Sequence, residues 1–415
     1  MLGEEKNKSH PPVDALPFRF YLMTSVGTGG RNMNLEFTEE QKILRESVKT
    51  FAEKEVAPLA YEIDRDERFP HESFKRLAEM GLLGVTVPIE YGGAGAGYTE
   101  MCIIGEELGV VCCSTSATWG AHADLCVDNI RRNANLAQKK KYLPPLCDGN
   151  KIGGLAMTEP SSGSDILSMR LRAEKKGDFF ILNGSKIFIS NGPVGDVFVI
   201  YAKTSPEKGA HGVSAFIVEK EFPGFSRGKK FEKMGWRGSP TGELVFEDCR
   251  VPQENLLGEK DKGVDVLMSG LNTERILLGA LSLGISRGAF ECALKYAKER
   301  VQFGKPIAAF QLIQSKLADM SMEIELSRLI TYQGAALADR GLKRELNLIA
   351  AYAKLFTSES AMRVTTEAVQ ILGGYGYMKE FPVERMMRDA KLQAIGGGTS
   401  EIQRLIIARE ILGAK

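Results

Sequence analysis

The sequence predicts an α+β chain with an N-terminal helical domain, a middle antiparallel β domain and a C-terminal helical bundle. Three observations predict this order. A helical pattern starts at a capping box formed by Thr38 and Gln41. Short β-branched and aromatic runs begin after Lys151, and the helical period returns after Gly263. We therefore predict a disordered leader over residues 1–32, a helical domain over 33–150, a β domain over 151–258 and a helical bundle over 259–415.

The first helical domain is predicted from the spacing of its apolar residues. Leu44, Val48 and Phe51 recur on one face after the capping box, which predicts an amphipathic helix. Further helical stretches follow up to about residue 150, and the glycine-rich segment YGGAGAGY (91–98) interrupts them.

The middle third contains the runs DFFIL, KIFIS, DVFVIYAK, VSAFIV and ELVFE, which are typical of strands. Asn183 and Gly184 stand between the first two runs. Because Asn-Gly between two strand-like runs favours a tight turn, we predict a β-hairpin at this position.

The last third shows the helical period again. Ile285, Ala289, Ala293 and Tyr296 lie on one face of a predicted helix, and glycines near residues 341 and 373–374 separate the later helices. This pattern predicts a helix bundle.

Composition excludes several classes of function. The 54 Lys and Arg residues nearly balance 53 Asp and Glu residues, without a basic stripe, so nucleic-acid binding is not expected. No apolar run reaches the roughly 18 residues of a membrane span. Seven dispersed cysteines without a CxxC pair, beside four histidines, predict neither a metal site nor a disulfide framework. Glu4 and Glu5 argue against an organelle-targeting leader.

Two segments of the β domain are candidates for cofactor contacts, although the chain has neither a GxxxxGK[ST] motif nor a strand-borne GxGxxG. AMTEPSSGSD (156–165) offers hydroxyls and amide N–H groups to a phosphate or a ring edge. KIFISNG (186–192) ends a strand with an aromatic ring and a hydroxyl. Each segment alone is also compatible with an ordinary polar loop or strand end.

Together these segments resemble the flavin-contacting motifs of the acyl-CoA dehydrogenase family. The resemblance extends from about residue 33 to residue 415 and includes RVQFGKPIAAFQ (300–311), QILGGYGY (370–377), RDAK (388–391) and GTSEIQR (398–404). It implies a homotetramer that binds FAD, a helical–β–helical fold, and electron-transfer flavoprotein as the electron acceptor. A bacterial chain of this kind would be cytoplasmic, and a eukaryotic one would lie in the mitochondrial matrix.

The resemblance also implies which residues bind FAD. The positions expected to contact the flavin and its phosphates are Met157, Thr158, Ser164, Phe188 and Ser190, with Phe188 in place of the commoner Trp. The positions expected to hold the FAD of a neighbouring subunit are Arg300, Phe303, Gln311, Gln370, Gly373 and Gly374, with Thr399 and Glu401 at the adenosine end.

The expected reaction needs a carboxylate that takes the α proton of the acyl group. Most relatives carry a Glu immediately before GTS, but this chain has Gly397 there. Glu274, in LNTERILL (271–278), stands where the isovaleryl and long-chain branches of the family carry their base. Its apolar neighbours predict partial burial. By the same resemblance, Arg275 would assist CoA binding and the Gly397 N–H would polarise the thioester carbonyl.

The acyl group is predicted less directly. Gly397 leaves room for a branched group, and residues 120–144 resemble the isovaleryl-CoA dehydrogenase type, so an isovaleryl-like substrate is expected. Ala117 and Trp119 depart from that type and would reshape the pocket, which leaves a bulkier aryl, alicyclic or substituted dicarboxylic acyl-CoA open. Arg131 and Arg132 are interpreted as exposed helix charges, with carboxylate recognition as the alternative.

Two other functions are considered on the same scaffold. A flavin oxidase would share the binding motifs, because access of oxygen to the flavin leaves no sequence pattern. A catalytically silent binding protein is disfavoured by the presence of Glu274 at a base position.

Overall fold

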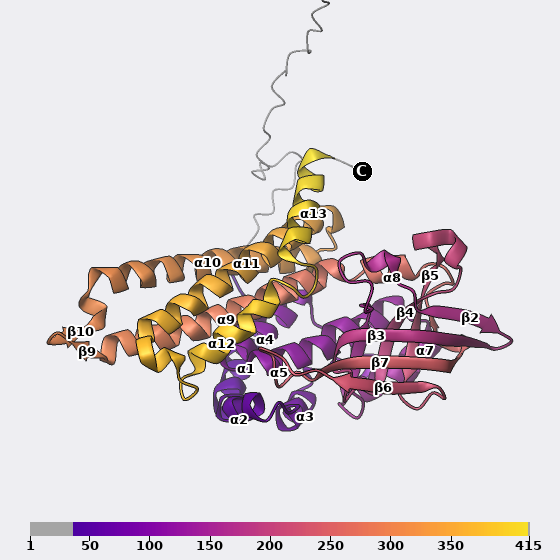
Figure 1. Ribbon diagram of the computed structural model, residues 1–415, viewed down its shortest axis with the longest axis horizontal. Coiled ribbons are helices and arrows are strands. Elements are labelled where there is room, and N and C mark those ends of the chain that lie inside the picture. The colour runs from indigo at the N-terminus through magenta and orange to yellow at the C-terminus, as the bar shows by residue number, and fades with distance from the viewer. Residues whose placement is uncertain (1–35, 414–415) are drawn as a thin grey trace, which may run out of the picture. The chain divides into compact units, whose positions relative to one another are not determined.

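The computed structural model describes residues 36–413 (Figure 1). The leader predicted over residues 1–32 lies outside the described residues. The domain boundaries proposed at residues 150 and 258 fall between the last helix before the strands and the first helix after them.

The first part of the described chain is helical. Its helices are α1 (Glu39–Phe51), α2 (Ala60–Arg65), α3 (His71–Glu79), α4 (Tyr98–Val111), α5 (Cys113–Gly120), α6 (Asn129–Asn133) and α7 (Leu136–Cys147). The predicted capping box is confirmed, because the Gln41 N–H donates to the Thr38 hydroxyl and the Thr38 N–H donates to the Gln41 side chain. A π-helical segment, Ala121–Asp128, joins α5 to α6. Such segments are frequent at functional sites because they change the direction of side chains within a helix.

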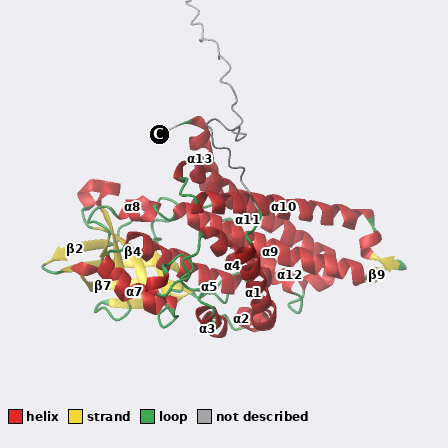
Figure 2. Cartoon of the chain, turned by 180° about the vertical axis from the view of Figure 1, so that it is seen from behind, coloured by secondary structure: helices red, strands yellow, loops and turns green. Residues whose placement is uncertain are grey.

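The strands follow as one mixed sheet (Figure 2). They are β1 (Gly153–Ala156), β2 (Arg172–Lys176), β3 (Phe179–Ser190), β4 (Val197–Lys203), β5 (Val213–Glu219), β6 (Phe225–Lys230), β7 (Thr241–Pro252) and β8 (Leu256–Leu257). The order is β6-β7-β3-β2-β4-β5-β8, with β1 paired to β4. Most neighbours are antiparallel as predicted, but β4 pairs in parallel with β1 and β2.

The hairpin predicted at Asn183 and Gly184 is wrong. Strand β3 runs through both residues, and its pairing with β7 shifts register there, which makes this position a β-bulge. The Asn183 side chain explains the difference, because it exchanges hydrogen bonds with Asp248 on β7 at 3.1 and 2.8 Å. The turn lies instead at Gly177 and Asp178, between the paired residues at the ends of β2 and β3.

The last part of the chain is a helix bundle, as predicted. Its elements are α8 (Gly263–Met268), α9 (Leu271–Glu299), β9 (Val301–Gln302), β10 (Lys305–Pro306), α10 (Gln311–Asp339), α11 (Lys343–Leu372), α12 (Pro382–Gln393) and α13 (Ser400–Leu412). Helices α9, α10, α11 and α12 run alongside one another (Figure 1). Within the described chain, one stretch, Gly263–Glu299, is apolar and long enough to span a membrane, but 72% of its most apolar window is buried inside the fold. It is the central helix of the bundle.

Helix α9 also packs directly on α4, and small residues set the distance between the two helices. A methyl group placed on Gly284 would lie 2.3 Å from the carbonyl oxygen of Glu106 and 3.0 Å from the Cα of Gly109. A methyl group on Gly288 would lie 2.1 Å from the carbonyl oxygen of Val110. Because these atoms belong to the backbone, the helices cannot accept larger side chains without separating.

We expect Gly284→Ala to lower the free energy of unfolding by about 1–3 kcal/mol, because the added methyl group overpacks the α4–α9 contact. Chemical denaturation monitored by circular dichroism would measure the change. Gly120→Ala is the matched control, because Gly120 is also a buried helical glycine. The methyl group added there would make an ordinary 3.4 Å contact with Leu277. Equal stability of the two variants would show that the α4–α9 contact tolerates side chains.

Candidate active site

Glu274 lies in the first turn of α9, where its N–H donates to the carbonyl of Gly270. The side chain is half-buried among Arg275, Ile276 and Leu277, all of them buried, which agrees with the predicted partial burial. Burial raises the pKa of Glu274, and the positive charges of Arg275, Lys354 and Arg132 act in the opposite direction. The result is a carboxylate of increased basicity.

Gly397 lies beside this carboxylate. A methyl group placed on Gly397 would be 3.4 Å from Oε1 of Glu274 and 2.3 Å from Cδ1 of Leu278. Gly397 also has a φ of 62°, in the left-handed region that favours glycine. The two positions at which the resemblance places a base, residues 274 and 397, are therefore neighbours in space.

The backbone around Gly397 forms a turn, here called the 397–398 turn, whose carbonyl groups are fixed. Lys354 Nζ donates to the Gly398 carbonyl at 2.6 Å, and Gln403 Nε2 donates to the Gly397 and Gly398 carbonyls at 3.3 and 3.1 Å. Within residues 36–413, no acceptor is found for the N–H groups of Gly397 and Gly398. These N–H groups are free to donate to a ligand oxygen.

A small cavity opens beside Glu274, lined by residues of the π-helical segment, α6, β1 and the start of α9, including Met157, Arg132 and Leu271. The interpretation of Arg131 and Arg132 as exposed helix charges is wrong. Their guanidinium groups bind the fully buried carboxylate of Asp128 at 2.7 Å, and the Arg132 side chain is only 15% exposed. Both arginines point toward the interior because the buried Asp128 carboxylate requires positive partners.

Asp124 also lines this cavity and was missed by the sequence reasoning. It is buried, and its Oδ1 has no hydrogen-bond partner among the described residues. Burial, followed by the nearby charges of Asp128 and Glu274, holds the pKa of Asp124 well above its usual range. Burial therefore favours the protonated form of Asp124, which can donate or accept a hydrogen bond inside the cavity.

Arg275, the residue expected to assist CoA binding, is buried next to Glu274. Its Nη1 donates to Oδ1 of Asn272 at 2.9 Å, whereas its Nε has no partner in the described part of the chain. Burial lowers the pKa of Arg275. An unpaired buried guanidinium N–H fits a ligand that brings an acceptor oxygen.

The flavin-contacting positions predicted at Met157, Thr158, Phe188 and Ser190 lie beside one backbone contact between the 156–165 loop and β3. The N–H of Ile187 donates to the carbonyl of Thr158 at 2.9 Å, which joins the 156–165 loop to the end of β3. Phe188 has a positive φ of 60° and a ring that is 62% exposed, while Ser190 follows two residues later. An open aromatic face beside hydroxyl groups fits a flat, polar-edged ring system such as a flavin. Met157 connects this region to the Glu274 cavity. Ser164 is exposed on the same loop.

Lys186, on β3, holds the 156–165 loop from inside the protein and was not predicted as a site residue. Its Nζ donates to the carbonyl of Met157 and to Oε1 of Glu159, both at 2.8 Å. Glu159 in turn accepts from the N–H groups of Arg170 and Leu171. Burial lowers the pKa of Lys186 to about 8, although Glu159 acts against this shift. The loop is thus attached to a buried ion pair.

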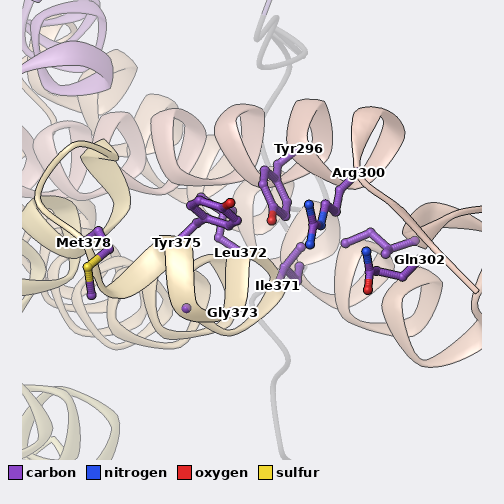
Figure 3. A pocket seen from close by; sticks show the side chains of 10 residues that line it. Tyr296, Arg300, Gln302, Ile371, Leu372, Gly373, Tyr375 and Met378 are labelled. Carbon is purple, nitrogen blue, oxygen red and sulfur yellow. The ribbon is translucent and has the colours of Figure 1, made fainter.

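A second cavity lies at the far end of the helix bundle and brings together three of the residues predicted to hold a neighbour's FAD, namely Arg300, Gly373 and Gly374 (Figure 3). The Arg300 guanidinium stands 5.7 Å from the ring centre of Tyr375. Phe303, Gln311 and Gln370 are exposed and do not line the cavity; Phe303, at the turn between β9 and β10, is 93% exposed.

The other predicted residues fall into two different settings. Thr399 caps α13, where its hydroxyl accepts from the N–H of Ile402, and Glu401 is exposed in the first turn of that helix. Ala117 and Trp119 are buried in the core, and the Trp119 indole donates to the carbonyl of Leu82 at 2.7 Å. Neither of these two lines the Glu274 cavity. Their proposed effect on the substrate would therefore be exerted from the surrounding core.

This fold and this site define a family of flavoenzymes. Family models match the chain as acyl-CoA dehydrogenase N-terminal domain over residues 38–150, middle domain over 154–249 and C-terminal domain over 261–412. The chain belongs to the acyl-CoA dehydrogenase family, whose members are FAD-dependent oxidoreductases and are typically tetrameric.

The relatives of this chain are named for different acyl-CoA substrates. The chain is 46% identical to the mitochondrial isovaleryl-CoA dehydrogenase of Pongo abelii over 376 residues, which covers 90% of this chain and 88% of the relative. It is also 46% identical to the cyclohex-1-ene-1-carbonyl-CoA dehydrogenase of Syntrophus aciditrophicus, with 93% of each covered. The solved butyryl-CoA dehydrogenase of Megasphaera elsdenii superposes with a TM-score of 0.89 at 42% identity, covering 92% of this chain and 100% of that one.

We expect Lys186→Met to reduce both the flavin content and the stability of the protein. The substitution frees the Met157 carbonyl and leaves Glu159 buried without its cation, which should cost about 3–5 kcal/mol in the free energy of unfolding. Flavin absorbance per chain and chemical denaturation would measure the two effects. The exposed Lys175→Met on β2 is the control, and adding Glu159→Gln to Lys186→Met should recover part of the stability. Unchanged flavin content in Lys186→Met would contradict a role for this ion pair in shaping the loop.

Proposed function

We propose that the chain removes two hydrogens from the α and β carbons of an acyl-CoA thioester, with Glu274 as the catalytic base. The observation that carries this proposal is the position of the half-buried Glu274 carboxylate beside the 397–398 turn, whose N–H groups have no acceptor within the described chain. A base and a donor to the developing enolate oxygen are the two groups that α-proton abstraction requires.

In the proposed mechanism the acyl group lies beside Glu274, and the exposed face of Phe188 would contact the flavin. The Gly397 N–H donates to the thioester oxygen, which stabilises the negative charge that forms as the α proton moves to the Glu274 carboxylate. FAD, when bound, would accept the hydride that leaves the β carbon. The α and β carbons gain a double bond. Arg275 would offer its unpaired Nε–H to the CoA portion.

The proposed FAD contacts divide between two cavities. Met157, Thr158, Ser164, Phe188 and Ser190 would contact the flavin and its phosphates. The cavity at Arg300 and Gly373 shares no residue with the Glu274 cavity. This separation supports the proposal that it, with Phe303, Gln311 and Gln370, serves the FAD of a neighbouring subunit in a homotetramer. Thr399 and Glu401 would meet the adenosine end. Electron-transfer flavoprotein is the proposed electron acceptor.

An isovaleryl-like branched acyl group is the substrate that we propose first. The small Gly397 and the similarity to isovaleryl-CoA dehydrogenase support it. One observation favours a second candidate, a substituted dicarboxylic acyl-CoA. Arg132 and Asp124 line the cavity beside the base, and Arg132, together with the protonated form of Asp124 that burial favours, can donate hydrogen bonds to a carboxylate.

We expect Glu274→Gln to keep its flavin and fold but to lose turnover by about 10²–10⁴-fold, because the amide cannot take the α proton. Steady-state oxidation of isovaleryl-CoA with an artificial electron acceptor would measure the loss. Glu299→Gln is a matched control, since Glu299 is exposed at the other end of the same helix. Full activity in Glu274→Gln would remove this residue from the mechanism.

We expect a panel of thioesters to separate the two substrate candidates. Isovaleryl-CoA and the thioester in which a carboxylate replaces one of its methyl groups have nearly the same shape, so their kcat/KM ratio reports the polarity of the pocket. A higher value for isovaleryl-CoA is expected from the first proposal, and the reverse would favour the dicarboxylic class. Aryl and alicyclic thioesters complete the panel. Rapid reoxidation of the reduced enzyme by air would instead assign an oxidase.

A further inference from the structure

Lys354 is a buried cation without a carboxylate partner in the described chain. It lies on α11, is 1% exposed, and forms no ion pair among residues 36–413. Within the described part of the chain its one hydrogen bond is the 2.6 Å contact from Nζ to the Gly398 carbonyl. A buried ammonium is costly unless its surroundings use the charge, so the position of Lys354 calls for a physical reason.

The charges around Lys354 come from three elements. Glu274 and Arg275 act on it from α9, Glu401 from α13 and Glu359 from α11 itself. Burial lowers the pKa of Lys354 to about 8, so the ammonium is still mainly protonated at neutral pH. Glu274, for its part, is acted on by Arg275 of its own helix, by Lys354 and by Arg132 of α6. Lys354 is thus the cation that α11 supplies to the base.

The hydrogen bond to Gly398 has a second consequence. Each peptide group is planar and joins the carbonyl of one residue to the N–H of the next, so the Gly397 carbonyl shares a plane with the Gly398 N–H, and the Gly398 carbonyl with the Thr399 N–H. Gln403 holds the first of these two planes, and Lys354 and Gln403 together hold the second, so the backbone that directly follows the Gly397 N–H has little freedom to rotate. Both residues are glycines with positive φ. The turn therefore has no side chains of its own to stabilise it, and it depends on hydrogen bonds from other elements.

We propose that Lys354 is a positioning residue that holds the 397–398 turn in the orientation for thioester binding and keeps the neighbouring Glu274 ionised. This inference rests on the proposed function of Glu274 and Gly397. A lysine with a purely structural role would join α11 to the turn and stabilise the fold. Its removal would weaken the binding of a thioester and of a ligand without the carbonyl group to the same extent. The two roles therefore differ in measurable ways.

The first test measures binding to the holoenzyme. A 2-enoyl-CoA thioester and the matching alkyl-CoA thioether differ in the carbonyl group that the turn would bind. We expect wild type to bind the thioester more tightly and Lys354→Met to lose most of this preference, whereas Lys354→Arg should retain part of it. Lys343→Met, an exposed lysine at the start of α11, is the control. An equal loss of affinity for both ligands in Lys354→Met would overturn the positioning role.

The second test is the pH dependence of kcat/KM. The base must be ionised, so activity is lost as the pH falls through the pKa of Glu274. A nearby cation lowers that pKa, and its removal raises it, so the acid limb of Lys354→Met should move to higher pH by about one unit. The limb of Lys354→Arg should stay near that of wild type. We also expect kcat/KM of Lys354→Met at neutral pH to fall by about 100-fold, since the donor and the base are misplaced together.

The outcomes separate this inference from the proposed function. If wild type oxidises no acyl-CoA, or Glu274→Gln stays active, the proposed function fails. If wild type is active and depends on Glu274, but Lys354→Met keeps both its thioester preference and its pH profile, the role of Lys354 is overturned. Flavin content and thermal unfolding of each variant establish that it is folded. Should Lys354→Met fail to fold, the same two measurements on Lys354→Arg and Lys354→Gln decide, and wild-type behaviour in Lys354→Gln would overturn the proposal.

Discussion

The close contact between α4 and α9 is the constraint on which the site depends. Backbone meets backbone at Gly109, Gly284 and Gly288, so α9 lies deep in the bundle with α4 on one side and α10 and α11 on others. Its first turn is partly buried, beside Arg275 and the 397–398 turn. A carboxylate at the exposed start of a surface helix would keep an ordinary pKa. On α9 it is half-desolvated, and desolvation gives it the basicity that proton abstraction needs.

Burial alone would also protonate this carboxylate, and the surrounding cations limit that effect. Arg275, Lys354 and Arg132 approach Glu274 from three different helices, and each favours the ionised form. Asp124 is acted on by Arg132 and Arg131, but burial is the largest influence on it. Asp128 and Glu274 also act against its ionisation, so its pKa is held well above its usual range. The surroundings of two carboxyl groups near one cavity thus raise both pKa values, with cations limiting the effect at Glu274.

Local patterns predicted the order of elements, the Thr38 cap and the partial burial of Glu274, because each depends on neighbours in the sequence. The predictions from local patterns were wrong where the structure of a segment depends on a residue that is distant in the sequence or whose burial the sequence does not reveal. Asn183 and Gly184 have the composition of a turn, but Asp248 on another strand holds the Asn side chain. Arg132 was read as solvated because Asp128 was not recognised as buried. The sequence around Lys354 does indicate its burial. Ala350, Ala351 and Ala353 are small apolar neighbours, which are typical of a helix segment that packs in a core, where a surface lysine is not expected.

The geometry at Gly397 explains how this fold can carry its base on α9. A side chain at position 397 would begin 3.4 Å from Oε1 of Glu274, so carboxylates from either position reach nearly the same point in space. Two carboxylates there would repel each other, and one would be protonated. Leu278, one turn beyond Glu274, occupies the space that a side chain at 397 would need. Glu274, Leu278 and Gly397 therefore share one space: a side chain at 397 would have to displace the end of Leu278, would approach the Glu274 carboxylate and would adopt a positive φ.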